Sequence, residues 1–383
     1  MFLQALIIFL RLKGSLRRKR SLDDETVRSV LIVELTRLGD VITMIPAVYL
    51  LARRFRNATL HLLVDRRYAA FLANVGLPCE VHGVERFENV SDFFKTVGAV
   101  RKLKVDLTLS MSPPKRNAAI TLMSGAHRKA GYLTYVDTLT PYLELTAVES
   151  FGCNLVSRQS YSNENIEERA LKVCRALGIP TGDVPRFLHL DEKLVATKLL
   201  SLVKKKNISS RSFVVLHPFS GWEYRSWDLS KFNELAAAIV SSLHCDVVFL
   251  CERSEEPMLA SSKAEFKGRN DVFFFASDDL MDTSVVLKEA AVVVCNDSGP
   301  MHLAATLGAR VVGLFGPASP ELTGPRAGNC ESIFKQVECS PCDQYNCIRP
   351  SNSCMTLIST NEVLQSVIKQ LSVAPAAEAV ANA

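Results

Sequence analysis

The strongest constraint on the fold is an alternation of short apolar runs and amphipathic stretches, which occurs twice along the chain. Short β-branched runs are typical of buried parallel strands, and apolar residues at helical spacing are typical of the helices that connect them. We expect strands at 27–35, 59–64, 105–111, 213–217, 246–250, 272–275, 291–294 and 310–315. We expect helices at 41–55, 66–75, 117–123, 166–177, 229–243 and 255–266. Two such series predict two doubly wound α/β domains.

Length and composition agree with this organisation. The chain has 383 residues, of which 48% are hydrophobic and 22% charged, as in ordinary globular proteins of about two domains. We expect Rossmann-like domains at 23–190 and 191–371, a linker near 180–210 and a disordered Ala-rich tail at 372–383. The net charge of +5 is too small to predict binding to nucleic acid.

The N-terminal segment 1–22 combines apolar and basic residues. Residues 1–10 are mostly apolar, and residues 11–20 carry Arg and Lys but no acid. The apolar part is shorter than the roughly 20 residues of a spanning helix, and its charges follow it, unlike those of a signal peptide. We interpret the segment as an interfacial helix on an anionic membrane surface at the cytoplasmic leaflet. A frayed tail is the alternative interpretation.

The chain has 11 cysteines, and six of them are scattered before residue 300, several in or beside apparent core strands or helices. Free Cys is a common core residue in a reducing compartment, which favours the cytoplasm. A second group lies near the end of the chain. The spacing of Cys339, Cys342, Cys347 and Cys354 suits a structural zinc site. Free thiols and disulfides are the alternatives for this group.

A polar motif follows the apolar run 291–294. Asp297 and Ser298 are residues that cap helix N-termini, and Pro300 suits a first helical position. We therefore expect the strand to turn directly into a helix, so that backbone N–H groups, the positive helix end and His302 lie at the carboxyl edge of a sheet. That arrangement favours an anion such as a diphosphate.

The segment 36–40 follows the first strand and ends in Gly39-Asp40. The Asp40 carboxylate is a candidate general base for an acceptor hydroxyl. The alternative is that Asp40 only caps the next helix.

Two further polar segments follow strands of the second series. In the segment 217–227, Ser220 offers a hydroxyl and Arg225 offers a guanidinium that can bind phosphate oxygens in pairs. In the segment 251–256, an acid can hydrogen-bond a ribose hydroxyl. The alternatives are a surface loop anchored by two tryptophans and an exposed acidic helix start.

The chain contains no Asp-x-Asp triplet, through which metal-dependent nucleotide-sugar enzymes commonly hold the diphosphate. Together with Arg225 and the helix end, this pattern favours stabilisation of a leaving diphosphate without a metal ion.

In their order and spacing, these motifs resemble the bacterial glycosyltransferase family that contains the ADP-heptose:lipopolysaccharide heptosyltransferases. The resemblance runs from about Val30 to Leu371 and is strongest at 37–47, 217–227 and 297–317. It implies a GT-B fold, in which two Rossmann-like domains face a central cleft, and an inverting, metal-independent transfer. It implies that Asp40 is the base and that the donor is bound by Ser220, Arg225, Glu255, Asp297, Ser298, Gly299 and His302. Glu252 or Glu256 can take the place of Glu255, and Arg225 stands where the family often carries Lys.

The family places the acceptor on the N-terminal domain. There Lys115, Arg116 and Arg128 are candidates to meet an acidic core sugar, with an ordinary solvated surface as the alternative. The expected enzyme moves a heptose or related sugar from a nucleotide diphosphate, first of all ADP-heptose, to a lipid-linked lipopolysaccharide core. It is expected to be a monomer that needs no cofactor, peripheral on the cytoplasmic face of the inner membrane. The alternatives are a family member that uses another nucleotide sugar, an epimerase of the same fold, or a non-catalytic protein that binds nucleotide sugars or glycolipids.

Overall fold

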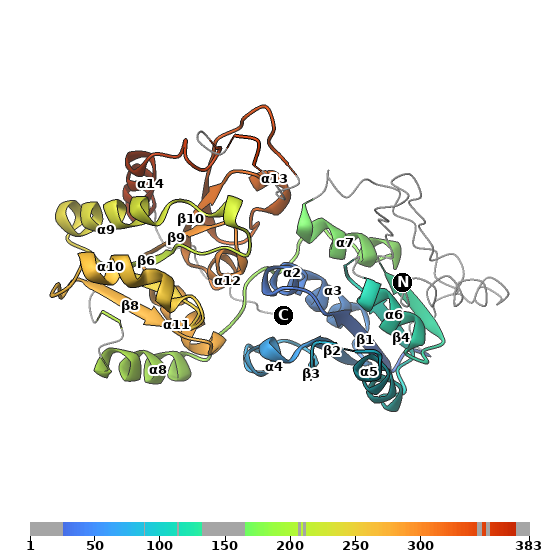
Figure 1. The fold of residues 1–383 in the computed structure, drawn as a ribbon. Coiled ribbons are helices and arrows are strands. Elements are labelled where there is room, and N and C mark those ends of the chain that lie inside the picture. Colours follow the sequence, from blue (N-terminus) through green and yellow to red (C-terminus); the bar gives the residue numbers. More distant parts are fainter. Residues whose placement is uncertain are drawn as a thin grey trace. The chain divides into compact units, whose positions relative to one another are not determined.

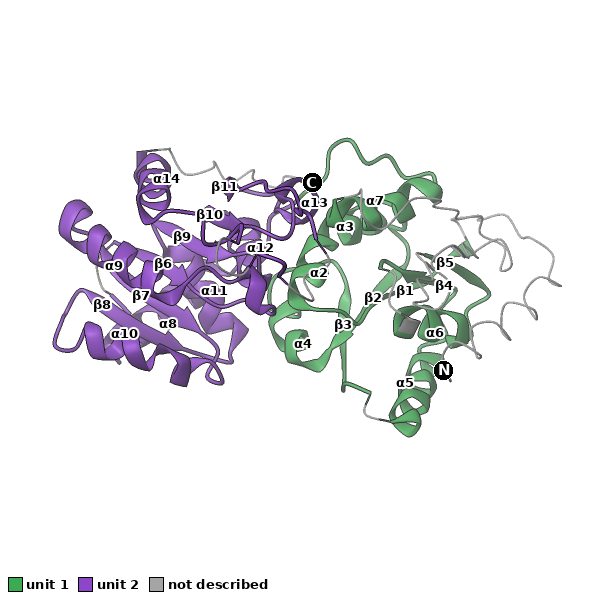
Figure 2. Ribbon diagram, turned by 45° about the horizontal axis from the view of Figure 1, so that its top comes forward, with its two compact units in different colours: residues 1–185 green, residues 186–383 purple. Residues whose placement is uncertain are grey.

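The computed structural model describes residues 26–87, 89–112, 115–131, 165–205, 208–209, 212–342, 347–349 and 353–372. The expected interfacial segment 1–22 lies outside these residues, as does the expected tail from residue 373 onward. The chain divides into two compact units, 1–185 and 186–383, each built on its own sheet (Figures 1 and 2). No helix of the described residues is both long enough and apolar enough to cross a bilayer.

The N-terminal unit holds a five-stranded parallel sheet in the order β3-β2-β1-β4-β5. Its strands are β1 (Ser29–Glu34), β2 (Thr59–Asp65), β3 (Glu80–Val84), β4 (Leu107–Ser110) and β5 (Arg128–Gly131). Its helices are α2 (Leu38–Thr43), α3 (Ile45–Arg54), α4 (Arg66–Leu72), α5 (Val90–Lys102), α6 (Lys115–Met123) and α7 (Ile166–Ala176). The apolar run of β1 is buried because the strand lies in the centre of this sheet.

The C-terminal unit holds a six-stranded parallel sheet in the order β11-β10-β9-β6-β7-β8. Its strands are β6 (Phe213–His217), β7 (Asp246–Cys251), β8 (Val272–Ala276), β9 (Val292–Asn296), β10 (Arg310–Phe315) and β11 (Asn329–Phe334). Its α-helices are α8 (Glu192–Lys204), α9 (Leu229–Leu243), α10 (Ala260–Glu265), α11 (Leu280–Glu289), α12 (Gly299–Thr306), α13 (Pro320–Thr323) and α14 (Thr360–Ser372). Two short 3₁₀ helices, η2 (Glu223–Arg225) and η3 (Glu256–Leu259), precede α9 and α10.

The core of the C-terminal unit lies between β6, β7, β9 and β10 and helices α9 and α14. Trp227 and Phe232 are buried in it, with an edge-to-face ring contact at 5.0 Å between centroids. The Trp227 indole N–H donates to the carbonyl of Ile358 at 3.0 Å, so the segment after β6 is tied to the chain just before α14.

Strand order reverses once in each sheet. The first strand of each unit lies between its second and fourth strands: β1 between β2 and β4, and β6 between β7 and β9. At such a switch point the connections leave in opposite directions and open a crevice at the carboxyl ends of the strands. Each unit therefore offers one ligand site, at β1/β4 and at β6/β9.

The structure confirms the expected alternation and corrects several elements. The expected helix 41–55 is two helices, because Pro46 lacks the N–H that a continuous helix would use. The expected linker 180–210 contains helix α8, which ends in the basic run. Elements that the pattern did not predict include β3, β5 and β11, whose strands are short or partly exposed, and α5 and α14.

Candidate functional site

Asn296, the last residue of β9, joins the two sides of the C-terminal switch point. Its side-chain oxygen accepts from the backbone N–H of Trp227 at 3.0 Å, and its amide donates to the carbonyl of Pro218 at 2.7 Å. Asn296 is completely buried. The loop between β6 and α9 is therefore held against the end of β9, which brings Arg225 to the start of α12.

Arg225 and Asp297 form an ion pair, with 3.1 Å between the Arg225 Nη1 and the Asp297 Oδ2. The Thr323 hydroxyl donates to the same oxygen at 3.2 Å. Burial raises the pKa of the Asp297 carboxyl, while Arg225 and Thr323 act in the opposite direction. Asp297 therefore holds the Arg225 guanidinium at the edge of the sheet, and its expected contact with the donor stays a prediction.

Several buried polar atoms at this edge have no hydrogen-bond partner within the described part of the chain. They are Ser298 Oγ, His302 Nδ1 and His217 Nδ1. Burial and the charge of Arg225 lower the pKa of His302 to about 4, and burial lowers the pKa of His217 to about 4. Both rings are therefore neutral at pH 7. Unpartnered polar atoms are rare in folded proteins, so their grouping beside a helix start indicates a place for a polar ligand.

Ser298 is the N-cap residue of α12, and Gly299 is the first residue of that helix. The backbone of Ser298 is extended, and its hydroxyl is left for another partner. The first N–H groups of a helix have no acceptor within the helix. An anion at this point would therefore meet backbone N–H groups, the Ser298 hydroxyl and the positive end of α12 together.

Ser220 and Glu255 lie at the same sheet edge but are engaged locally. The Ser220 hydroxyl donates to the carbonyl of Trp222 at 2.6 Å and lies 3.1 Å from the Ser226 hydroxyl. The Glu255 carboxylate accepts from the backbone N–H of Glu252 at 3.0 Å, and Glu256 pairs with Lys263 at 2.6 Å. The neighbouring Glu252 is exposed.

Asp40 lies in the first turn of α2, directly after β1. The N-cap of that helix is Arg37, and the Asp40 carboxylate accepts a hydrogen bond from the Arg37 backbone N–H. Asp40 therefore caps the first turn of α2. Burial raises the pKa of the Asp40 carboxyl, and the charges of Arg169, Arg37 and Arg116 oppose this rise. A buried carboxylate with a raised pKa, beside arginines that favour its charged form, suits a general base.

Glu34, which the sequence argument did not select, ends β1 and is buried beside the same switch point. Its Oε1 accepts from the hydroxyls of Thr36 and Ser112, the latter at 2.7 Å, and from the Asn117 amide at 3.4 Å. Burial, together with the charge of Asp40, raises the pKa of Glu34 to about 7. The sequence signal that could have identified Glu34 is an acidic residue at the end of an otherwise apolar strand.

The basic candidates of the N-terminal unit lie at different places. Arg116 is half-buried at the start of α6, near enough to Glu34, Asp40 and Asp65 for their charges to interact. Lys115 begins α6, but its side chain is outside the described residues. Arg128 begins β5 and donates to Thr26 at 2.9 Å, at the amino edge of the sheet and opposite to Asp40. The structure therefore brings Arg116, but not Arg128, to the Asp40 edge.

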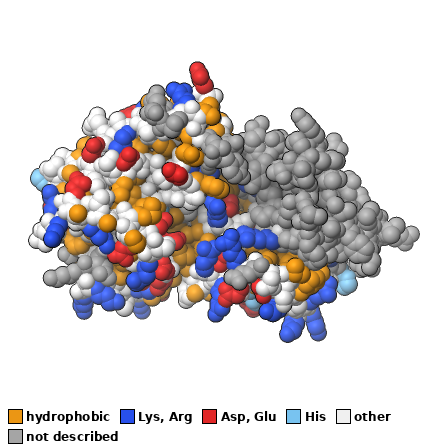
Figure 3. Space-filling view, viewed as in Figure 1, with side chains coloured by type: hydrophobic (Ala, Val, Ile, Leu, Met, Phe, Trp, Pro, Cys, Tyr) orange, Lys and Arg blue, Asp and Glu red, His pale blue; other side chains and the backbone are white. Residues whose placement is uncertain are grey.

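Basic side chains also gather over α4 on the visible face of this unit (Figure 3). The exposed Arg66 and Arg67 belong to this surface, and they pair with Glu85 and Asp65. Such exposed pairs contribute little to stability.

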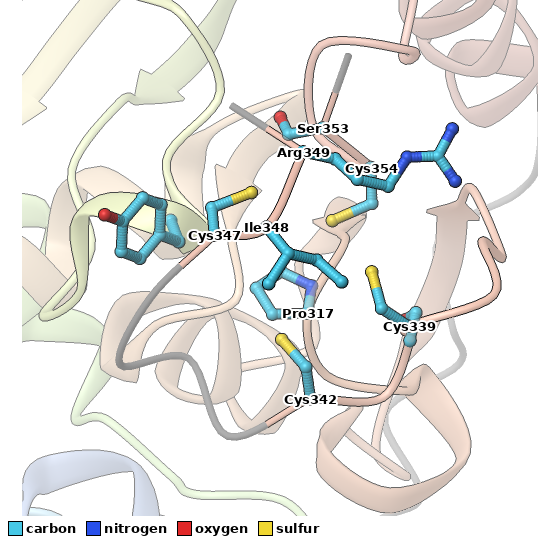
Figure 4. A pocket seen from close by; sticks show the side chains of 10 residues that line it. Pro317, Cys339, Cys342, Cys347, Ile348, Arg349, Ser353 and Cys354 are labelled. Carbon is cyan, nitrogen blue, oxygen red and sulfur yellow. The ribbon is translucent and has the colours of Figure 1, made fainter. Parts of the chain in front are cut away.

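The late cysteines line a pocket of about 310 Å³ after β10 (Figure 4). Its walls include Tyr224, Pro317, Cys339, Cys342, Cys347, Ile348, Arg349 and Cys354. Burial raises the pKa of the Cys354 thiol, and the nearby thiols of Cys342, Cys347 and Cys339 raise it further. Across the described ranges, no three of these sulfur atoms lie within 4.8 Å of one another. The structure groups the cysteines without forming a closed metal site.

A family model described as glycosyltransferase family 9 (heptosyltransferase) matches residues 94–352. Lipooligosaccharide heptosyltransferase 2 of Campylobacter jejuni is 33% identical over 148 residues, which cover 37% of this chain and 45% of that protein. Lipopolysaccharide heptosyltransferase 2 of Escherichia coli K12 is 33% identical over 107 residues, 26% of this chain and 30% of that protein. The matched stretches thus span less than half the length of these curated relatives.

The structure of E. coli ADP-heptose lps heptosyltransferase II superposes with a TM-score of 0.72 at 17% identity. The match covers 90% of this chain and 98% of that chain. At this identity the likeness is one of fold, and with the two parallel sheets it confirms the GT-B fold class.

Proposed function

Because the chain belongs to glycosyltransferase family 9, we propose that it transfers a heptose or related sugar from a nucleotide diphosphate to a lipopolysaccharide core acceptor. ADP-heptose is the first candidate donor, since the curated relatives are named heptosyltransferases and the name of the superposed E. coli enzyme includes ADP-heptose. One observation in this chain carries the proposal. It is the group of unpartnered polar atoms, including Ser298 Oγ and His302 Nδ1, beside Arg225 at the start of α12.

The donor diphosphate is proposed to bind at that helix start. Its oxygens would accept from the Ser298 hydroxyl, the Gly299 N–H and the His302 ring, with Arg225 as the nearby cation. Negative charge grows on the diphosphate as the bond to the sugar breaks, and fixed donors at a helix end stabilise such charge. These groups are proposed to act without a metal ion.

Asp40 is proposed to take the proton from the acceptor hydroxyl. The resulting oxygen attacks the anomeric carbon from the face opposite the diphosphate. The new C–O bond forms as the bond to the diphosphate breaks, and the electron pair of that bond leaves with the diphosphate. The configuration of the anomeric carbon is therefore inverted. On the acceptor side, Arg116 and Lys115 are the proposed partners of an acidic core sugar.

The decisive experiment substitutes Asp40→Asn, which keeps size and hydrogen bonding but removes the base. We expect kcat to fall by about 10²- to 10⁴-fold, the usual effect of losing a general base. ADP affinity, measured by calorimetry, should stay nearly unchanged because the donor groups belong to the other unit. Asp65→Asn is the matched control at the same sheet edge, and it should transfer at the wild-type rate.

The same assay separates the alternatives. Near-normal transfer by Asp40→Asn would remove the base assignment. Sugar conversion without acceptor would indicate an epimerase. Donor binding with no turnover in any condition would indicate a binding protein. A thermal-shift series with ADP, UDP, GDP and CMP identifies the base of the donor.

For the cysteine cluster, structural zinc is a proposal that rests on the spacing and on the shared pocket. In the structure the sulfur atoms are too far apart to bind one zinc ion together, so these thiols would have to move closer when zinc binds. Free thiols remain the competing state of this cluster.

Peripheral binding to the cytoplasmic face of the inner membrane is also proposed, on the basis of segment 1–22. Removing residues 1–20 should abolish sedimentation with anionic vesicles and leave transfer to a soluble, delipidated acceptor intact. Replacing the basic residues at 17–20 by Gln should weaken sedimentation in a salt-dependent way. Unchanged sedimentation of the shortened chain would show that another surface binds the membrane.

A further inference from the structure

We propose that His61, Glu80 and His82 form a Zn²⁺ site in the N-terminal unit, remote from the Asp40 edge. Strands β2 and β3 are parallel neighbours in which His61 pairs with Glu80 and Leu63 with His82. Paired residues of parallel strands share a face, and so do residues two apart along one strand. The pairing therefore places the three side chains on one face of the sheet.

That face is opposite to the one covered by α4. A Cβ added to Gly83 would approach the Cβ of Ala69 in α4 at 2.8 Å, so Gly83 faces α4. His82 is the neighbour of Gly83 and points the other way. His61 is buried, His82 half-buried and the Glu80 side chain 64% exposed, so the group is reachable from solvent on one side.

The potential ligand atoms converge on one point. The His61 Nδ1 lies 3.1 Å from the His82 Nε2 and 3.3 Å from the Glu80 Oε2. All three atoms lie within 4.8 Å of one another. Tetrahedral zinc with bonds of about 2.0–2.2 Å to nitrogen and oxygen separates its ligand atoms by about 3.3–3.5 Å. The observed spacing is close to that of an assembled site.

Hydrogen bonding alone does not satisfy this arrangement. The His61 Nδ1 carries at most one hydrogen but faces both the Glu80 carboxylate and the His82 ring. If this N–H donates to the Glu80 carboxylate, it cannot also make a full hydrogen bond to the His82 ring. If it donates to the His82 ring, the Glu80 carboxylate is left without that donor. A divalent cation between the atoms would accept an electron pair from each, and two imidazoles with a carboxylate suit zinc.

The position indicates a structural role. His61 lies in the first half of β2 and Glu80 begins β3, whereas Asp40 follows the carboxyl end of β1. Strand β3 is one of the two edge strands of the sheet. Zinc bound here would tie the edge strand to β2 and stabilise the unit without taking part in transfer.

The test measures zinc binding to the full chain after treatment with a chelator, using ZnCl₂ and a competing indicator dye. His82→Ala should lose one equivalent or bind it at least about 10-fold more weakly, since even outer partners of metal ligands are worth about 10- to 100-fold. Glu80→Gln should also weaken zinc binding. The Glu80 side chain is exposed, so this variant is expected to fold. His127→Ala removes an exposed histidine of the same unit and should bind like the wild type.

Cobalt distinguishes this site from the cysteine cluster. Co²⁺ bound to nitrogen and oxygen gives d–d bands without thiolate charge transfer, and His82→Ala should remove only that component. The inference is overturned if the wild type binds no zinc, if all bound cobalt shows thiolate charge transfer, or if His82→Ala and Glu80→Gln both bind zinc as the wild type does. Transfer activity of Glu80→Gln should be unaffected, so the outcome is independent of the proposed function.

Discussion

Glu34 and Asp40 are two buried carboxyl groups of one short segment with different surroundings. Glu34 is buried, and its hydrogen-bond donors are neutral, so it holds its proton up to about pH 7. Asp40 is also buried, but three arginines favour its ionised form. Two neighbouring carboxylates repel each other when both are charged. Neutral Glu34 therefore allows Asp40 to be the charged member of the pair.

This difference predicts how stability depends on pH. An unfolded Glu ionises above 4.5, whereas folded Glu34 keeps its proton to about pH 7, so the folded state loses stability as the pH rises from 4.5 through 7. Gln cannot ionise. Glu34→Gln should therefore be more stable than the wild type above pH 7, by up to about 3 kcal/mol, and nearly equal to it at about pH 4.5.

Unfolding followed by circular dichroism at about pH 5 and about pH 8 checks this sign. Glu362→Gln is the opposite control, because the hydrogen bond with Lys335 lowers the pKa of Glu362 to about 2. That variant should be the less stable one at both pH values. A stability difference of Glu34→Gln that does not change with pH would contradict the proposed protonation state.

Residues of the C-terminal site could be predicted where they form a continuous motif after a strand, as Asp297, Ser298 and His302 do. Their individual roles could not. The contact of Asp297 with Thr323 and the hydrogen bonds of Glu34 with Ser112 and Asn117 join positions that are 26 to 83 residues apart. Such partners depend on tertiary packing, which local patterns do not record.

At the scale of elements, the loop between β6 and α9 is rigid because Asn296 bonds to both of its ends. Asn296→Ala leaves the Trp227 N–H and the Pro218 carbonyl without this partner. We expect a loss of about 1–3 kcal/mol in the free energy of unfolding. We also expect ADP to bind about 10-fold more weakly, because Arg225 loses its fixed position.

Asn233→Ala provides the matched comparison. Asn233 is also buried and makes two side-chain hydrogen bonds, with Ser262 and Glu265 at 2.7 Å each, but it lies on α9. Urea unfolding should show a similar loss of stability, while calorimetry should show unchanged ADP affinity. If both variants bound ADP equally, the loop would not depend on Asn296 for its position.

Elements with strong periodicity were predicted well. Strands β6 and β10 and helix α9 begin and end at the expected residues. Strands β5 and β11 lacked a signal, since β5 is only four residues long and β11 is half exposed. Tertiary pairing, not local propensity, forms such strands.

At the scale of the whole molecule, the two sheets share one strand order, which in each unit places the first strand beside the fourth. The sequence pattern predicted two parallel α/β domains, but the order within each sheet followed only from the pairing. The donor candidates lie at the carboxyl edge of the second sheet, and Asp40 lies at the carboxyl edge of the first. Each unit has a complete sheet and its own buried core.

Residues 186–383 produced alone are therefore expected to fold cooperatively and to bind ADP nearly as tightly as the full chain. They should show no sugar transfer, because Asp40 is absent. Thermal unfolding and calorimetry measure the two properties. If the isolated unit folded but did not bind ADP, residues of the N-terminal unit would have to contribute to the donor site.

The ion pair between Arg225 and Asp297 has a consequence for the end of the catalytic cycle. Any phosphate that approaches Arg225 must share it with a carboxylate that is already in place at 3.1 Å. For the proposed donor site, this competition would limit how tightly a spent nucleotide is held. In the proposed reaction, Asp297 would reclaim the guanidinium after the sugar has left and so favour product release, whereas an uncompensated arginine would retain the diphosphate and slow the next turnover.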